Sequence, residues 1–416
     1  MRRREERGFT LVELVVSMGA GLLVTAAAFL LARNSAAFFQ RESSVTAAQF
    51  GSLVGMTRLQ SDLRRAAYLS SPHAAADPLL CGDSTVWPAG LQDLAGINIV
   101  EGGSVLTHAL DHGLSTVNGL NPDSIVIGGT FDTTEQFAVD VITTAGGGGF
   151  TVQLQNDGAM ARTSLAATQG APGITQVFAQ GRFLRIVDQE GRIGWGVITG
   201  TAEINGRFQV SVAATPELPT RNSQLTCGCE GFCTGALVNP VTRVRYDLRQ
   251  INPQAVPGYR PLYNRGFDPA LAQFHRGDNE VARTELIRVE LDAENQEIDT
   301  TLELLTEFAV DLKFGLAREQ LANPPPDLPV IERFAIGAAD VYATTRTPTT
   351  AGTPELARSI QVRLSTRSDR ADRDVGIPPT ANGGLYRYSL GPNRGFARVR
   401  TLITDITLVN QRRFTQ

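Results

Sequence analysis

The first 70 residues carry one long apolar pattern that changes character part-way along. From Phe9 to Ala32 the chain forms an apolar run in which Glu13 is the only charged residue, and no proline occurs between Phe9 and Ser71. At a rise of ~1.5 Å per residue, a helix of this length spans a hydrocarbon core of ~30 Å. The pattern therefore predicts a transmembrane or filament-core helix over residues 9–33.

The helix is predicted to continue as an amphipathic segment over residues 34–71. Apolar and small residues recur at steps of three and four, with polar residues between them that include Arg58, Gln60 and Asp62. The recurring positions are Val45, Ala48, Ser52, Met56, Leu59 and Leu63. Pro72 ends the run, which predicts one helix from about Phe9 to about Leu69. The alternative is an anchor and a separate helix, broken near Asn34.

After Pro72 the pattern changes to period-two, β-branched runs separated by Gly, Asp and Pro, which is typical of strands. The strand candidates are residues 123–127, 137–142, 150–154, 183–187, 195–198, 208–212, 242–248, 285–291, 308–314, 359–364 and 397–404. The predicted fold class is α+β: a long N-terminal helix and a large, mostly antiparallel β head over residues 72–416. Residues 140–235, strand-rich with their own turns, are a possible inserted subdomain.

Composition and charge narrow the classes of function. The chain has 416 residues and a formal net charge of -4, so it lacks the basic excess typical of nucleic-acid binding. Lys313 is the only lysine, a bias that we attribute to genomic composition. No phosphate-binding loop, dinucleotide fingerprint or nucleophile motif is present, so we predict neither catalysis nor a cofactor.

The N-terminus has the charge pattern of a targeted segment. Four arginines precede Gly8, which favours a cytoplasmic N-terminus with the rest of the chain on the other side of the membrane. A secretory signal peptide is one alternative, because Ala26-Ala27-Ala28 offers a small-x-small cleavage site. Glu13 fits neither a signal peptide nor a plain anchor, since a carboxylate within a bilayer costs about 2.5 kcal/mol or more unless it is paired.

The stretch Gly8-Phe9-Thr10-Leu11-Val12-Glu13 resembles the prepilin signal of type IV pilins and type II secretion pseudopilins. This resemblance implies that prepilin peptidase cuts after Gly8, which makes residues 1–8 a leader peptide, and then N-methylates Phe9. It also implies that Glu13 pairs with the N-terminal ammonium of a neighbouring subunit. Two charges that are each costly in lipid become tolerable together, and their pairing sets the register of packed helices.

Later segments resemble PilW-type minor pilins and the J-type pseudopilins, in the same order along the chain. These segments are residues 58–68, 306–315, 358–368 and 398–410. The resemblance implies a minor pilin that helps to prime type IV pilus assembly. Its implied partners are prepilin peptidase, other minor pilins, the major pilin and the inner-membrane assembly platform. The implied location is the inner membrane, with a periplasmic head, before assembly and the pilus or cell surface afterwards.

Three other functions stay open at this stage. A type II secretion or DNA-uptake pseudopilin is the close variant. A pilus-tip or membrane-anchored subunit whose head binds a surface or ligand belongs to a different class. The third is a secreted β-rich enzyme behind a signal peptide.

The four cysteines are Cys81, Cys227, Cys229 and Cys233. In a periplasmic head they are expected to form disulfides. A bridge between Cys227 and Cys229 would close a very tight ring, so we expect Cys81 to pair with one of these two and the remaining two to pair with each other. Zinc is the alternative, but the spacing lacks the paired C-x2-C knuckles of a zinc site.

Two further clusters contain side chains of the types that bind metal ions. His108 and His112 are spaced four apart, but the surrounding glycines favour an exposed loop. The acidic stretch from Asp292 to Asp299 could supply calcium ligands, although it lacks the EF-hand pattern and favours a solvated turn. We therefore predict no metal site.

Overall fold

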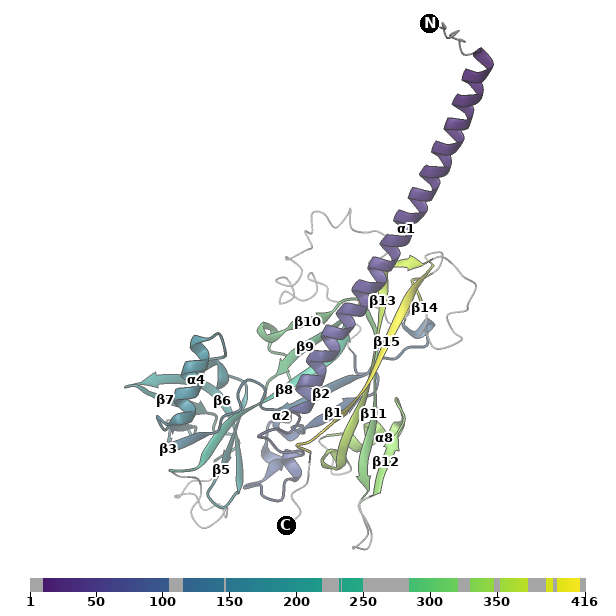
Figure 1. Cartoon of the computed structure of the whole chain (residues 1–416). Helices are drawn as coiled ribbons and strands as arrows, with labels where there is room; N and C mark the ends of the chain where they lie inside the picture. Colours follow the sequence, from purple (N-terminus) through teal and green to yellow (C-terminus); the bar gives the residue numbers. More distant parts are fainter. Residues whose placement is uncertain are drawn as a thin grey trace.

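The structure of the chain is a computed structural model. It describes residues 10–104, 115–145, 147–218, 232, 234–249, 284–320, 330–347, 352–372, 387–391 and 395–411, without the side chains of residues 37, 41, 44 and 370. A single long helix projects from a β-rich head, with the N-terminus at its far end (Figure 1). The predicted α+β fold class is confirmed.

One unbroken helix, α1, covers Leu11–Arg64, so a break near Asn34 is excluded. It ends before the predicted Leu69. Ala67 and Leu69 adopt left-handed conformations, with φ of 59° and 47°. The Ala67 N–H donates to the Gly128 carbonyl at 2.8 Å, at the end of a strand. The helix therefore ends where the chain docks on the head, several residues before Pro72.

The strands of the described residues form two sheets, and all pairings between them are antiparallel. The first sheet contains β1 (Ile97–Val100), β2 (Ser124–Gly129), β3 (Phe137–Thr144), β4 (Phe150–Leu154), β5 (Phe183–Val187), β6 (Ile193–Ile204), β7 (Arg207–Val212), β8 (Leu237–Arg249), β9 (Glu285–Leu291) and β10 (Glu303–Thr306). The second contains β11 (Ala309–Gln320), β12 (Val330–Phe334), β13 (Ala357–Asp372), β14 (Arg387–Ser389) and β15 (Phe396–Thr407), in the order β12-β11-β13-β15-β14.

Strand β8 belongs to two parts of the first sheet. Residues 237–241 pair with β5 and, at 237–238, with β3, whereas residues 242–249 pair with β2 and β9. The pairings β3-β4-β7-β6-β5-β8 return to β3, so these strands close into a ring around their own apolar core. We call this ring, residues 137–241, the side barrel; the predicted subdomain at 140–235 falls within it. Figure 1 shows it beside the rest of the head.

The main core lies where α1, the β2–β8–β9 part of the first sheet and the second sheet meet. Leu59 and Leu63 of α1 pack there with side chains of both sheets, such as Val244 and Phe314. Short helices complete the head: α2 (Ala89–Gln92), α4 (Gly158–Thr168), α5 (Ile174–Val177) and α8 (Ala339–Thr345), with 3-10 turns η1 (Ala74–Ala76), η2 (Ser84–Val86), η4 (Asp299–Thr301) and η5 (Pro354–Leu356). The head thus holds one half of α1 and leaves the other half outside.

Candidate functional site: the N-terminal helix and its attachment

The first turn of α1 is closed by a reciprocal cap between Thr10 and Glu13. The Glu13 N–H donates to the Thr10 hydroxyl at 3.3 Å, and Glu13 Oε2 accepts from the Thr10 N–H at 3.0 Å and from its hydroxyl at 2.9 Å. Such a capping box satisfies N–H groups that have no partner within the helix. Its signature, T-x-x-E, is visible in the sequence. The resemblance to prepilin signals implies only a pairing of Glu13 with a neighbouring subunit, and does not include this role as a helix cap.

The N-terminal half of α1 touches nothing else in the described structure. Its apolar window has a mean hydropathy of 2.3 and none of it is buried in the protein. Leu11 is 80% exposed and Leu31 70%. Gly8 and Phe9, the predicted processing residues, lie outside the described residues. By length and composition this half is able to cross a membrane. Apolar surface of this extent is unfavourable in water, so its exposure indicates a partner or a lipid environment.

Burial begins part-way along the same helix. Among the described side chains of α1, Val45 is the first that is buried, and Met56, Leu59 and Leu63 follow at helical spacing on the face toward the head. The predicted amphipathic positions in this half are therefore largely the ones that pack. Phe50, 68% exposed, lies on the opposite, outer side.

Helix α1 approaches strand β10 closely at Gly51 and Gly55. The Thr306 hydroxyl donates to the Gly51 carbonyl at 2.9 Å. A Cβ atom at Gly55 would lie 2.1 Å from Thr306 Oγ1, far inside contact distance. Gly55 is thus required by packing, because the helix backbone runs directly against the strand.

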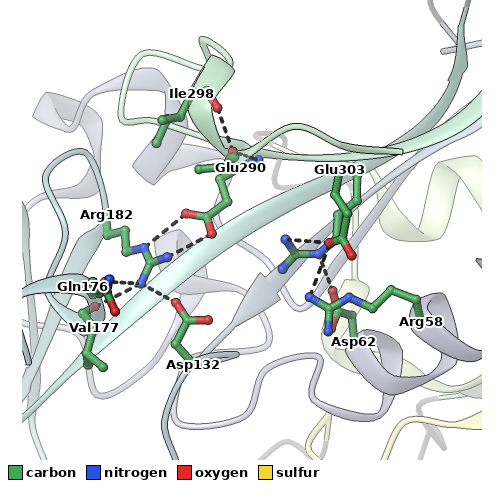
Figure 2. Close-up of polar contacts among 11 residues, drawn as sticks. Arg58, Asp62, Asp132, Gln176, Val177, Arg182, Glu290, Ile298 and Glu303 are labelled. Carbon is green, nitrogen blue, oxygen red and sulfur yellow. Dashed lines mark hydrogen bonds and ion pairs between the residues drawn. The ribbon is translucent and has the colours of Figure 1, made fainter. Parts of the chain in front are cut away.

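A buried polar group fixes the end of α1 to the sheet. Asp62 accepts hydrogen bonds from the Tyr246 hydroxyl at 2.7 Å and from Arg288 Nε at 2.8 Å, and Arg288 and Asp62 are almost completely buried. Figure 2 shows Asp62 and Arg58 on α1, with Glu303 beside them. Arg58, on the preceding turn of α1, lies 3.6 Å from Glu303, which also lies 3.9 Å from Arg288. We call this group, Arg58, Asp62, Tyr246, Arg288 and Glu303, the helix clamp.

The charges of the helix clamp stabilise one another. Burial disfavours the charge of Arg288, but the Asp62 carboxylate outweighs it and raises the pKa of Arg288. Burial and the same carboxylate raise the pKa of Tyr246 well above its ordinary value, so its hydroxyl stays a donor. Asp62 falls among the polar residues of the amphipathic pattern. Its burial depends on a partner 226 residues away, so spacing alone does not reveal it.

A second arginine joins the side barrel to the same strand that holds α1. Arg182 donates to both carboxylate oxygens of Glu290 on β9, at 3.1 and 2.9 Å. It also donates to the carbonyls of Gln176 and Val177 and pairs with Asp132 (Figure 2). Glu290 and Arg288 stand two residues apart on β9. One strand therefore carries both attachments.

The acidic stretch after β9 is neutralised by arginines of β8. Glu297 accepts hydrogen bonds from Arg245 and, at 2.9 and 3.0 Å, from Arg249, while Asn295 accepts one from Arg243. Burial lowers the pKa of Arg243 to about 10. Asp292 turns inward to bind the N–H groups of residues 294 and 296. The stretch is a turn docked on the sheet, and the Asp292 and Glu297 carboxylates already have partners.

The remaining candidate residues lie mostly outside the described ranges. Cys81 is disulfide-bonded, whereas Cys227, Cys229 and Cys233 lie outside the described residues, so the predicted pairing stays a prediction. His108 and His112 also lie outside the described residues. Within the described ranges no group of three or more His, Cys, Asp or Glu side chains is placed to hold a metal ion.

Comparison with protein families gives a match at the N-terminus. Residues 3–29 match the prokaryotic N-terminal methylation motif. The matched range contains Gly8, Phe9 and Glu13 and most of the exposed apolar half of α1. Comparison with curated proteins and comparison with solved structures each gave no match. The chain therefore carries a prepilin-type signal on a helix suited to membrane anchoring, followed by an antiparallel β head.

Proposed function

We propose that this protein is a minor pilin that helps to prime and build type IV pili, and that it has no catalytic activity. The observation that carries the proposal is the methylation motif placed on the exposed apolar half of α1. A helix that is apolar on all sides and unpartnered in its own chain is suited first to lipid and then to packing among other helices. The resemblance of segments further along the chain to PilW-type minor pilins supports the assignment to minor pilins in particular.

The proposed pathway begins in the inner membrane, with the head in the periplasm. Prepilin peptidase removes residues 1–8 and methylates Phe9. The assembly platform then transfers the subunit into a pilus, where it contacts other minor pilins and the major pilin. The second half of α1 stays packed on the head throughout, because the helix clamp holds it through buried charged hydrogen bonds.

The test of processing is mass spectrometry of the mature N-terminus in cells that make the protein. An N-methylated Phe9 at the N-terminus is the expected result. A terminus after Ala28 would instead indicate a secretory signal peptide, and an intact Met1 would indicate a plain anchor. Either result would overturn the proposal.

The test of assembly separates the two roles of Glu13. Glu13→Gln keeps a side chain that can complete the Thr10 cap but removes the charge. Glu13→Ala removes both. If the charge pairs with a neighbouring subunit, both variants should reduce piliation to a similar degree in electron micrographs. A defect confined to Glu13→Ala would mean that the cap alone matters, and normal piliation in both would contradict the proposal.

A second candidate role, binding of a surface or ligand by the head, is favoured by the side barrel. The barrel has its own core and lies beside the part of the head that holds α1 (Figure 1). Normal piliation with loss of surface attachment, in a strain with substitutions on the exposed barrel surface, would favour this role. A type II secretion or DNA-uptake pseudopilus is the close variant, and loss of secretion or uptake without loss of pili would favour it.

A further inference from the structure

The only lysine of the chain is placed against a buried aspartate between the two sheets. Lys313 of β11 donates to Asp123 Oδ1 at 2.7 Å, and the Asp123 side chain has no exposed surface. Other buried carboxylates of the described head pair with arginine, as Asp62 does with Arg288 and Asp311 with Arg363. Since 38 residues are Lys or Arg and one of them is Lys, this site differs in kind from the pairs around it.

Backbone contacts fix the positions of Asp123 and Lys313 relative to each other. The Asp123 N–H donates to the carbonyl of Leu312, the neighbour of Lys313, at 2.8 Å. β2 begins at the next residue, Ser124, and β11 is paired along its length with β13. The amine and the carboxyl group are therefore preorganised, which converts an unfavourable bimolecular reaction into a local one with a very high effective concentration.

The other groups around Asp123 suit the stabilisation of a reacting carboxyl group. The Tyr342 hydroxyl donates to Oδ2 at 2.9 Å, and the Gly102 N–H donates to Oδ1 at 3.1 Å. Donors fixed on both oxygens stabilise the negative charge that develops when a nucleophile adds to the carbon between them. Lys313 Nζ also lies 3.4 Å from the Tyr342 hydroxyl, so amine, hydroxyl and carboxyl form one closed triad.

A second buried carboxyl group stands two positions before the lysine on β11. The Asp311 side chain is fully buried; one oxygen binds Arg363 and the other, Oδ1, has no hydrogen-bond partner in the described structure. Burial raises the pKa of Asp311 and of Asp123, and their mutual repulsion adds to the shift of Asp311. A carboxyl group able to hold a proton at this position suits general acid–base transfer.

We propose that Lys313 and Asp123 form an intramolecular amide bond that cross-links the two sheets of the head. The Lys313 amine attacks Cγ of Asp123, the Cγ–O bond breaks, and one oxygen leaves as water. Ammonium and carboxylate together supply the atoms of the amide and the water, so no oxidant or co-reactant is needed. The Lys313 ammonium first gives one proton to the Asp123 carboxylate across their hydrogen bond, which leaves a neutral amine to attack. After the attack Asp311 takes a second proton from the nitrogen and gives it to the same oxygen, which then leaves as water, while Tyr342 and Gly102 hold the carboxyl oxygens.

The single lysine makes the test direct. The untagged full-length protein is purified, reduced and denatured, its mass is measured, and it is digested with a lysine-specific endopeptidase. The expected mass is one water below that of the processed sequence, and the expected digest is uncut. Trypsin, which also cuts after arginine, should release a branched peptide that joins residues 66–162 to residues 289–318.

A full mass would overturn the proposal whatever the digest shows. A mass one water low with clean cleavage after Lys313 would also overturn it, since the water would then come from another site. Lys313→Arg provides the reference for an uncut, unlinked chain of full mass. These measurements do not depend on pilin processing, because the leader and its removal change the mass by a known and separate amount.

Two variants keep both reacting side chains and remove the proposed helpers. Asp311→Asn should slow bond formation by about 100-fold or more, the usual contribution of a general acid–base group, and Tyr342→Phe should slow it as well. The readout is the fraction of chain resistant to the lysine-specific endopeptidase at successive times after synthesis. Asp405→Asn, at an exposed carboxylate of β15, is the control and should match the wild type.

Discussion

The two halves of α1 share one helix but are suited to different surroundings. The half that contains Leu11 and Leu31 is apolar on every side and exposed, and Glu13 finds its hydrogen bonds within its own first turn. The half that contains Leu59 is apolar on one face only. It carries a charged residue, Asp62, on the side that is buried.

The difference shows which interactions each half is built to make. Side chains of the second half meet partners of the same chain at fixed geometry, through the close approach at Gly55 and the helix clamp. The first half offers an apolar surface with no matching surface in the described head. Substitutions in the second half should therefore change the stability of the head, whereas equivalent substitutions in the first half should change only membrane or filament contacts.

The largest expected effect is at Asp62. Asp62→Ala leaves Arg288 charged and Tyr246 without its acceptor, both in buried positions, which should lower the free energy of unfolding by about 3–5 kcal/mol. Urea unfolding in detergent, followed by the fluorescence of Trp87 and Trp195, measures it. Arg58→Ala removes a half-exposed partner of the same clamp and should cost about 0–1 kcal/mol. Equal losses would show that the clamp does not depend on burial.

A leucine pair compares the two halves with the same change. Leu59→Ala opens a cavity at a fully buried position and should cost about 2–5 kcal/mol. Leu23, 71% exposed, is the matched control, and Leu23→Ala should leave the unfolding curve of the head unchanged. A similar loss in both would contradict the proposed division of the helix.

A glycine pair tests the close approach to β10. At Gly55 a methyl group would collide with Thr306, so Gly55→Ala should cost about 1–3 kcal/mol despite the better helix propensity of alanine. At Gly19 nothing lies within 4 Å, and Gly19→Ala should not destabilise the head. Thermal unfolding by circular dichroism measures both, and a stabilised Gly55→Ala would show that the helix can move away from the strand.

The smallest effect is expected where an ion pair lies on the surface of the head. Hydrogen bonds from Arg162 lower the pKa of Glu135, so the pair stabilises the fold above the ordinary pKa of glutamate and loses that contribution as pH falls through the lowered value. Glu135→Gln should be slightly less stable than the wild type at neutral pH, and the two unfolding curves should converge in acid. A constant difference across pH would assign the effect to packing.

The sequence was sufficient where a pattern was local and strong. The strands at 150–154 and 183–187 are observed with the predicted bounds. The first alternates clearly between apolar and polar residues, and the second is a short, mostly apolar run. The strands β1, β10, β12 and β14 were not predicted. Each of these strands is short. Strands β10, β12 and β14 form through pairing with a neighbouring strand, and β10 also packs on α1, contacts that a short sequence pattern does not reveal.

The attachment of α1 was beyond sequence reasoning for a different reason. The T-x-x-E cap is a local signal and could have been found. Asp62 has the spacing of a polar surface residue, and it is buried because Arg288 of strand β9 pairs with it. Helix α4, capped by Asp157, was also absent from the prediction, although its N-cap and alanine-rich sequence are local signals.

The helix clamp has a consequence for the order in which the protein folds. Tyr246 and Arg288 follow Asp62 by 184 and 226 residues. During synthesis the buried face of α1 is therefore completed long before the strands that cover it. Contacts this distant in sequence fold slowly. If the apolar first half is anchored in a membrane, as proposed, it holds the second half beside that membrane until the last strands of the head are synthesised.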